Sequence, residues 1–244
     1  MLKVLHDFKN EVVKRKLFKS AKSYVDIENS LFDMGEDYLH RGWAFEVFAE
    51  AYLKLGIYRP LQNVYPENVI PSKLKNNLKL PPRITNQKGI DGVYETQSNQ
   101  LFTYQVKFHD LGYKLTWGKL GGSLAISSKA SGVMIFTNTE TIPKEIEDHG
   151  GFGITRADLL EIDDYDIKRI VDFIYKDKVT RAKPFELKDY QKEAFKDVIK
   201  ELKVSDRTQL IMACGTGKTL VGQRIIEKMD GEISLILVPS LSLL

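Results

Sequence analysis

The sequence predicts an α/β protein in which a mixed β-sheet flanked by helices is followed by a partial P-loop domain. Two short runs rich in β-branched and aromatic residues, separated by turn formers, predict an antiparallel hairpin within residues 88–107. Helical and strand-like segments alternate on both sides of that hairpin in the chain, which favours a sheet covered by helices. Near residue 215, a glycine loop followed by Lys218 and Thr219 lies between a predicted strand and a predicted helix.

The composition is that of an ordinary globular protein. The chain has 244 residues, of which 43% are hydrophobic and 28% are charged, enough for one large domain or two small ones. The single cysteine, Cys214, excludes an internal disulfide framework and fits a reducing cytoplasm. The four histidines are scattered and give no zinc-ligand spacing. There is no apolar run of about 18 residues, so we expect neither a signal peptide nor a membrane span.

A helix is expected at residues 41–55, after a mostly helical stretch over the first forty residues. Gly56 is a plausible C-cap for it. Two carboxylates, Glu46 and Glu50, lie one turn apart inside this otherwise apolar segment, so both could point at the sheet. The helix is expected to bury an aromatic and aliphatic stripe made of Phe45, Phe48, Ala49, Tyr52 and Leu53.

Three polar residues are expected at one end of the predicted hairpin. Asp91 begins the first strand, and Gln105 and Lys107 share one face of the second strand because side chains alternate along it. Carboxylate and amide oxygens are hard ligands for Mg²⁺, and a lysine can orient a water or stabilise phosphate charge. Gly89 and Gly92 bracket Asp91, as expected where the backbone bends or a ligand approaches closely. The pattern suits a divalent-metal phosphodiester site, although lysines on strands are usually solvated edge residues.

A basic segment leads into this region. Between Glu67 and Asp91 there is no acidic residue, whereas five basic residues lie there: Lys73, Lys75, Lys79, Arg83 and Lys88. The segment could lie along a phosphate backbone, and a solvated loop is the alternative.

After the hairpin, further elements complete the first domain. A helix is expected at 115–130, a buried strand at 132–138 and a short strand at 152–155. An acidic stretch at 157–177 with a helical apolar stripe closes the domain. The expected organisation is a first domain over 1–178, a linker over 179–184 and a second domain over 185–244.

The second domain contains a P-loop in its expected context. A helix near 187–195 and a strand at 207–213 precede the loop, and a helix to about residue 229 and a strand at 232–239 follow it. Backbone N–H groups of the loop would cradle phosphates, Lys218 would reach the β and γ phosphates and Thr219 would hold Mg²⁺. Met212 stands in place of the usual first glycine. The expected loop contacts are Cys214, Gly215, Thr216, Gly217, Lys218 and Thr219.

The first domain resembles the Mrr-like branch of the PD-(D/E)XK nucleases. The resemblance covers roughly residues 40–140 and rests on Phe45-Glu46, Gly89-Ile90-Asp91-Gly92 and Gln105-Val106-Lys107. It implies a restriction-endonuclease-like fold and a Mg²⁺-dependent DNA endonuclease, with Glu46, Asp91 and Gln105 around the metal. It also implies that Lys107 lies beside the attacking water. Ile90 stands where the wider superfamily has its proline, which is usual in this branch.

The second domain resembles the RecA-like core of superfamily-two helicases and translocases. Residues 213–219 are similar to their first motif, and residues 237–244 to the start of their next motif. Gln191 matches their upstream glutamine that reads adenine, with Lys188 where arginine is more usual. The resemblance implies that this domain binds ATP. The alternative for Gln191 is that it is a surface residue of a helix with no role in binding.

A nuclease followed by a translocase core is similar to the single-chain, ATP-dependent, Type ISP-like restriction-modification enzymes. We therefore expect a cytoplasmic DNA endonuclease module joined to the beginning of its motor, acting on double-stranded DNA. The acidic Mg²⁺-binding motif, the arginine finger and the second lobe of such motors do not occur in the sequence. The expectation is thus a piece of a larger enzyme that carries motor, methyltransferase and target-recognition domains.

Two other functions compete with this expectation. One is an ATP-dependent helicase or translocase of DNA repair whose nuclease-like domain only binds DNA. The other is a non-enzymatic DNA-binding fragment. Because a pure binding module has no need for metal ligands, the intact set of Glu46, Asp91, Gln105 and Lys107 argues against both.

Overall fold

The computed structural model describes residues 2–81, 89–182, 186–213 and 216–229, which divide into two compact units over residues 1–182 and 183–244. The first unit contains, in order, α1 (Lys9–Lys14), α2 (Tyr24–Phe32), α3 (Tyr38–Lys54), β1 (Leu61–Pro66), η1 (Glu67–Val69), α4 (Ser72–Asn77), β2 (Gly92–Thr96), β3 (Leu101–Lys107), α5 (Trp117–Ile126), β4 (Gly132–Thr137), α6 (Lys144–Asp148), β5 (Phe152–Ile154), α7 (Arg156–Leu160) and α8 (Asp164–Lys176). The second unit contains α9 (Asp189–Glu201) and α10 (Lys218–Met229).

The first unit is built on a five-stranded mixed sheet in the order β1-β2-β3-β4-β5. The pairs β1–β2 and β2–β3 are antiparallel, whereas β3–β4 and β4–β5 are parallel. The predicted hairpin is confirmed as β2 and β3, in which Gly92 pairs with Tyr104 and Glu95 with Leu101. The strands predicted at 132–138 and 152–155 are confirmed as β4 and β5.

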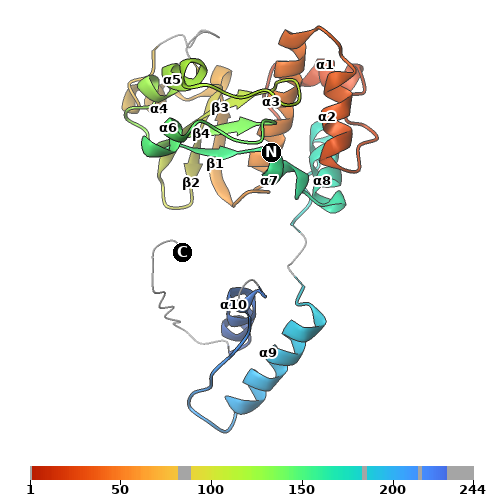
Figure 1. Cartoon of the computed structure of the whole chain (residues 1–244), viewed down its shortest axis with the longest axis vertical. Helices are drawn as coiled ribbons and strands as arrows, with labels where there is room; N and C mark the ends of the chain where they lie inside the picture. The colour runs from red at the N-terminus through yellow and green to blue at the C-terminus, as the bar shows by residue number, and fades with distance from the viewer. Residues whose placement is uncertain (1, 82–88, 183–185, 214–215, 230–244) are drawn as a thin grey trace. The chain divides into compact units, whose positions relative to one another are not determined.

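Helices cover both faces of this sheet, as the sequence predicts (Figure 1). Alternation along the strands sends Tyr104 and Phe136 into the cluster that contains α3, α2 and α8. On the other face, Val133 and Ile135 pack against Leu120 of α5. The open end of the hairpin, where β2 begins and β3 ends, lies between these two layers of helices.

The central helix of the unit is α3. It starts at Tyr38, three residues before the predicted start, because the Asp37 side chain caps it by accepting a hydrogen bond from the His40 N–H at 3.4 Å. It ends before Gly56, whose φ of +65° suits the left-handed position after a helix. Phe45 lies 5.4 Å from Phe136 between ring centroids, and almost every residue from Ala44 to Leu53 is buried. Any carboxylate in this helix therefore needs a partner or a cavity.

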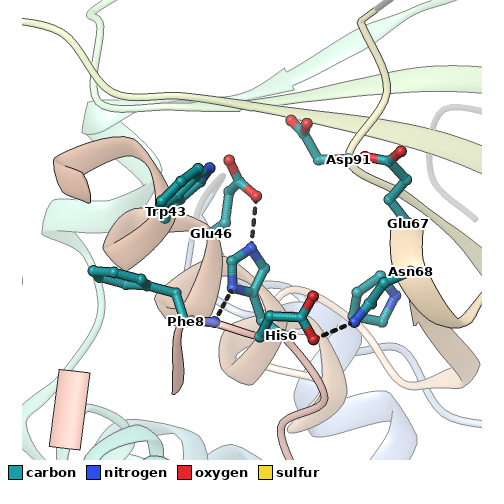
Figure 2. Close-up of a pocket in the computed structure, with 9 residues that line it drawn as sticks. His6, Phe8, Trp43, Glu46, Glu67, Asn68 and Asp91 are labelled. Atoms are coloured by element: carbon teal, nitrogen blue, oxygen red, sulfur yellow. Dashed lines mark hydrogen bonds and ion pairs between the residues drawn. The ribbon is translucent and has the colours of Figure 1, made fainter. Parts of the chain in front are cut away.

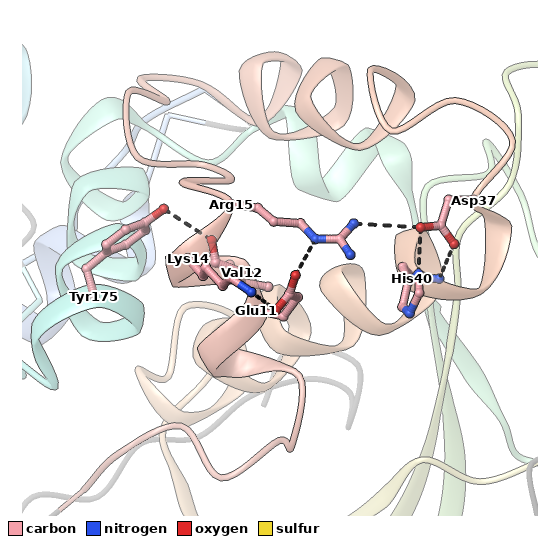
Figure 3. Close-up of polar contacts among 7 residues, drawn as sticks. All are labelled: Glu11, Val12, Lys14, Arg15, Asp37, His40 and Tyr175. Carbon is pink, nitrogen blue, oxygen red and sulfur yellow. Dashed lines mark hydrogen bonds and ion pairs between the residues drawn. The ribbon is translucent and has the colours of Figure 1, made fainter.

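Polar contacts hold α1 against its neighbours (Figure 3). Arg15 contacts Glu11 at 2.7 Å and Asp37 at 3.7 Å, which links α1 to the start of α3. The Tyr175 hydroxyl of α8 lies 3.5 Å from the Val12 carbonyl of α1 and donates to the carbonyl of Leu17, just after α1, at 2.6 Å. The ion pairs are partly exposed and contribute little each, so buried Val12 supplies the main attachment.

Residues that follow α8 pack back on that helix. Arg169 Nε donates to the Thr180 carbonyl at 2.8 Å, and the Tyr165 hydroxyl donates to the Arg181 carbonyl at 3.0 Å. Part of the expected linker therefore packs on α8, and the unit extends to Ala182. The helix predicted at 115–130 is shorter, because α5 ends at Ile126.

The second unit departs from prediction at residues 207–213. The expected helices are confirmed as α9 and α10, but 207–213 has no strand structure, and Ile211 is 82% exposed. A strand needs a neighbour to pair its N–H and C=O groups, and the described part of this unit offers none. The strand expected at 232–239 lies outside the described residues.

The basic segment is described in part. Lys73 and Lys75 belong to α4, and Lys79 follows it, whereas Arg83 and Lys88 lie outside the described residues. Within the portion of the chain that is described, no helix has the length and apolar character needed to cross a membrane.

Candidate functional site

A cavity of about 440 Å³ lies at the end of the hairpin where β2 begins (Figure 2). Glu46 of α3 and Asp91, which precedes β2, both line it, so two predicted site residues from different elements meet there. Neither Gln105 nor Lys107 is among its lining residues. The cavity is lined by His6, Asp7, Phe8, Trp43, Glu46, Pro66, Glu67, Asn68 and Asp91.

Backbone contacts fix the position of Asp91. Its N–H donates to the Tyr104 carbonyl at 2.8 Å, and its Oδ2 accepts a hydrogen bond from the Val106 N–H at 2.6 Å. The carboxylate thus occupies the place where the next hydrogen bond of the β2–β3 ladder would form. A Cβ on neighbouring Gly92 would lie 2.3 Å from the Tyr104 ring, so a side chain there would have to displace this buried ring.

The electrostatics of the cavity disfavour negative charge. Burial and the nearby charge of Glu46 raise the pKa of Asp91 to about 7, although the Val106 N–H and Lys107 act in the opposite direction. Burial and the charge of Glu46 also raise the pKa of Glu67 above its usual value. The cavity therefore holds carboxylates that repel one another, a condition that a bound cation would relieve.

Glu46 has one partner in the cavity, His6. Nε2 of His6 lies 2.8 Å from Oε2 of Glu46, and both side chains are partly exposed. Burial by itself lowers the pKa of His6, but the hydrogen bond to Glu46 and the charges of Glu46 and Glu50 outweigh it and leave the pKa raised.

Glu50, the other glutamate of α3, is only 1% exposed and fully engaged. Its two oxygens accept hydrogen bonds from the Leu5 N–H at 2.7 Å and the His6 N–H at 2.8 Å. Lys54 Nζ lies 2.5 Å from Oε1. Glu50 does not line the cavity, and its carboxylate holds the segment around Leu5 against α3.

Gln105 is buried on the α5 side of the sheet and does not line the cavity. Its Nε2 would lie 3.3 Å from a Cβ on Gly89, and its Oε1 is buried with no hydrogen-bond partner among the residues that the structure describes. An unsatisfied buried amide oxygen is costly and calls for a ligand or water. Lys107 ends β3 and lies close enough to Asp91 to lower its pKa.

The candidate ligand atoms are oxygens of the kind that bind a hard divalent cation. Carboxylate oxygens of Glu46 and Asp91 and the unpartnered Oε1 of Gln105 are the ligands that Mg²⁺ prefers. Across the described ranges, no group of three or more His, Cys, Asp and Glu side chains is arranged to hold a metal. The predicted set contains only two residues of those types, so its third protein ligand is the Gln105 amide.

Of the nine residues that line the cavity, sequence reasoning named only Glu46 and Asp91, and the missed residues include His6 and Glu67. Glu67 opens η1, and its N–H donates to the Asp91 carbonyl at 2.9 Å. A signal for Glu67 exists in the sequence, since it is the last acid before the basic segment. His6 has no comparable signal, because only the tertiary fold brings it to α3.

In the second unit, Gln191 and the P-loop segment are in direct contact. Gln191 Nε2 donates to the Thr216 carbonyl at 2.8 Å, and its Oε1 accepts from the Lys188 N–H at 2.8 Å. Gly217 has a φ of +79°, and a Cβ there would lie 2.4 Å from Gln191 Nε2. The positive φ favours glycine here, and a side chain would also have to displace the Gln191 amide.

Lys218 and Thr219 begin α10, as the P-loop pattern predicts. Lys218 Nζ donates to the carbonyls of Met212 and Ala213, both at 2.9 Å, so its amine lies over the segment that precedes the loop. Thr219 is exposed at the first turn. Cys214 and Gly215 lie outside the described residues.

Comparisons with known proteins agree with the P-loop pattern. Residues 184–244 match the family described as "Type III restriction enzyme, res subunit". No curated protein matches the chain significantly in sequence. The C-terminal segment is thus similar to the helicase-like part of a restriction enzyme.

A solved structure with a similar fold is the ATP-dependent Type ISP restriction-modification enzyme LlaBIII bound to DNA. The TM-score is 0.57 at 24% identity, and the similarity covers 86% of this chain. Because residues 183–244 make up only a quarter of the chain, the matched region includes most of the first unit. The chain spans 13% of the length of that enzyme, and the similarity shows the fold alone.

Proposed function

We propose that the first unit is a Mg²⁺-dependent DNA endonuclease and that the second is the beginning of an ATP-driven DNA motor of a restriction enzyme. The observation that carries the nuclease proposal is the meeting of Glu46 and Asp91 in one cavity. The buried Gln105 oxygen, which has no hydrogen-bond partner among the described residues, supports it. The match of residues 184–244 to a restriction-enzyme subunit supports the motor proposal.

In this proposal, Glu46, Asp91 and Gln105 hold the metal. When bound, Mg²⁺ supplies a Lewis acid and lowers the pKa of a bound water. Two backbone contacts fix Asp91 before any ligand arrives, so little reorganisation is needed. A bound cation would also offset the charge of Glu46, which together with burial raises the pKa of Asp91.

Lys107 supplies the remaining chemistry. It occupies the last position of β3, on the same face as Gln105 and near Asp91. From there its amine would orient the attacking water or stabilise charge that develops on the phosphate. Double-stranded DNA is the proposed substrate, and Lys73, Lys75 and Lys79 are candidates for contacts to its backbone.

For the motor, Lys218 and Thr219 would bind the phosphates and Mg²⁺ of ATP at the start of α10. Lys218 would exchange its carbonyl partners, Met212 and Ala213, for phosphate oxygens. Gln191 would present its amide to adenine from a position already fixed against Thr216.

The nuclease proposal is tested by nicking of supercoiled plasmid in Mg²⁺. Asp91→Asn and Lys107→Ala are expected to reduce cleavage at least a hundredfold while leaving the circular dichroism spectrum unchanged. Lys114→Ala is the matched control, because Lys114 is exposed on the loop that follows β3 and the change removes the same charge. If Asp91→Asn and Lys107→Ala both cut as fast as the parent, the site is wrongly placed.

A parent protein that binds DNA but does not cut it in Mg²⁺ or Mn²⁺ would refute the nuclease proposal. The first unit would then be a DNA-binding module attached to a motor, as in the repair translocase considered above. Retention of a plasmid fragment on a filter at low ionic strength distinguishes this result from a protein that does not bind DNA at all.

A further inference from the structure

The segment Leu5–Phe8, called the strap below, lines the cavity through His6, Asp7 and Phe8 and is held by contacts to α3 and η1. On the α3 side, Glu50 accepts hydrogen bonds from the Leu5 and His6 N–H groups at 2.7 and 2.8 Å. Lys54, whose side chain is 4% exposed, balances the charge of Glu50 and also donates to the Lys3 carbonyl at 2.9 Å. A buried ion pair thus fixes the backbone of the strap.

On the opposite side, the strap is tied to η1. Asn68 Nδ2 donates to Asp7 Oδ1 at 2.7 Å (Figure 2). Phe8, at the end of the strap, stacks on His40 at 5.2 Å between ring centroids and contacts Trp43 at 5.6 Å. These contacts leave the His6 ring inside the cavity with a defined position and direction.

The hydrogen bonds of the His6 ring fix its tautomer. The Phe8 N–H donates to Nδ1 at 3.1 Å, so Nδ1 is the acceptor nitrogen. In the neutral ring the proton is therefore on Nε2, and Nε2–H donates to Oε2 of Glu46 at 2.8 Å. This contact occupies one oxygen of Glu46 and leaves Oε1 for another partner.

We propose that His6 is a positioning residue that holds the Glu46 carboxylate in the orientation needed to bind the metal. The proposal rests on the nuclease function proposed above and adds a residue to its site. Within the described residues, His6 is the only hydrogen-bond partner of the Glu46 carboxylate. Without the His6 hydrogen bond, the flexible Glu46 side chain would no longer be held in one rotamer. At other metal sites, removing a residue that orients a ligand lowers metal affinity about 10- to 100-fold.

The two glutamates of α3 then have linked roles. Glu50 holds the strap, the strap places His6, and His6 orients Glu46. Since Glu46 and Glu50 are one turn apart, a single helix supplies both the ligand and the anchor of the residue that orients it.

The test measures Mn²⁺ affinity from the electron paramagnetic resonance signal of the free ion, with the full chain and no DNA. His6→Leu is expected to weaken binding about tenfold. His6→Gln, whose amide nitrogen can take the place of Nε2 as a donor, is expected to stay within about threefold of the parent. His149→Leu is the matched control, because His149 is exposed on the loop after α6 and outside the cavity, and it is expected to bind as the parent does.

A double-mutant cycle separates positioning from a general loss of structure. If His6 acts through Glu46, His6→Leu in the background of Glu46→Gln weakens Mn²⁺ binding no further than Glu46→Gln alone. Additive losses would overturn the proposal, and so would parent-like affinity in His6→Leu. Tighter binding in His6→Leu would also overturn it, because the strap would then be blocking the Glu46 oxygen.

Failure of the underlying nuclease site looks different. If Asp91→Asn binds Mn²⁺ as well as the parent, the metal site itself is wrong and the role of His6 is refuted with it. If Asp91→Asn weakens binding but His6→Leu does not, only the role of His6 is refuted. In cleavage assays, His6→Leu is expected to raise the Mg²⁺ concentration that gives half the maximal rate, while the rate at saturating Mg²⁺ is largely retained.

Discussion

Replacement of Glu50 by alanine is expected to destabilise the first unit strongly. The Glu50 side chain is 1% exposed and its partner Lys54 is 4% exposed, so solvent screens this pair very little. The change would leave the Lys54 charge buried without its partner and the N–H groups of Leu5 and His6 without acceptors. Breaking a buried ion pair costs about 3–5 kcal/mol, which for a unit of this size corresponds to a fall in Tm of roughly 6–20 °C.

Urea unfolding followed by tryptophan fluorescence measures the loss of stability of the first unit in Glu50→Ala. The chain has two tryptophans, Trp43 and Trp117, and both belong to the first unit. The signal therefore reports unfolding of the first unit alone, and the free energy of unfolding follows from the midpoint and slope.

Glu46→Gln is the matched comparison, one turn away on the same helix. It removes a partly exposed charge and the ionic contact with His6, but it also relieves repulsion with Asp91. We expect a stability change within about 1 kcal/mol and a large loss of metal-dependent cleavage. If Glu50→Ala unfolds within about 0.5 kcal/mol of the parent, or if Glu46→Gln is the less stable of the two, the roles assigned to the glutamates are wrong.

Two further predictions concern the second unit. Gly217→Ala is expected to weaken binding of a fluorescent ATP analogue about tenfold, because its φ of +79° is strained for alanine and its Cβ would displace Gln191. Gly222→Ala, in open space inside α10, is the control and should leave affinity unchanged. Lys218→Ala is expected to weaken the analogue about 10- to 100-fold by removing a charge-assisted phosphate contact, yet to leave plasmid cleavage within about twofold of the parent. Loss of cleavage in Lys218→Ala would contradict independent action of the two units.

Local sequence patterns predicted the elements that carry the site. Alternation along the β3 run placed Gln105 and Lys107 on one face, and the hairpin placed Asp91 at the same end, as β2 and β3 confirm. The apolar stripe of α3 was equally clear, because residues one turn apart share a helix face whatever the rest of the fold does.

What could not be predicted depends on contacts between distant segments. His6 reaches Glu46 only because Glu50 binds the backbone of the strap, and no local pattern encodes that contact. The same contact distinguishes the two glutamates, which look alike in the sequence. The strand expected at 207–213 is absent for a related reason, since β propensity does not supply a pairing neighbour and the described part of the second unit contains none.

In the proposed site, Glu46 and Asp91 hold one divalent metal together with Gln105. Anomalous scattering from Mn²⁺-soaked crystals tests it most directly. We expect a single strong peak at about 2.0–2.3 Å from a carboxylate oxygen of Glu46, one of Asp91 and Oε1 of Gln105, as for an oxygen-ligated divalent ion of this size. A peak elsewhere, or a cavity without one at Mn²⁺ concentrations that support cleavage, would contradict it.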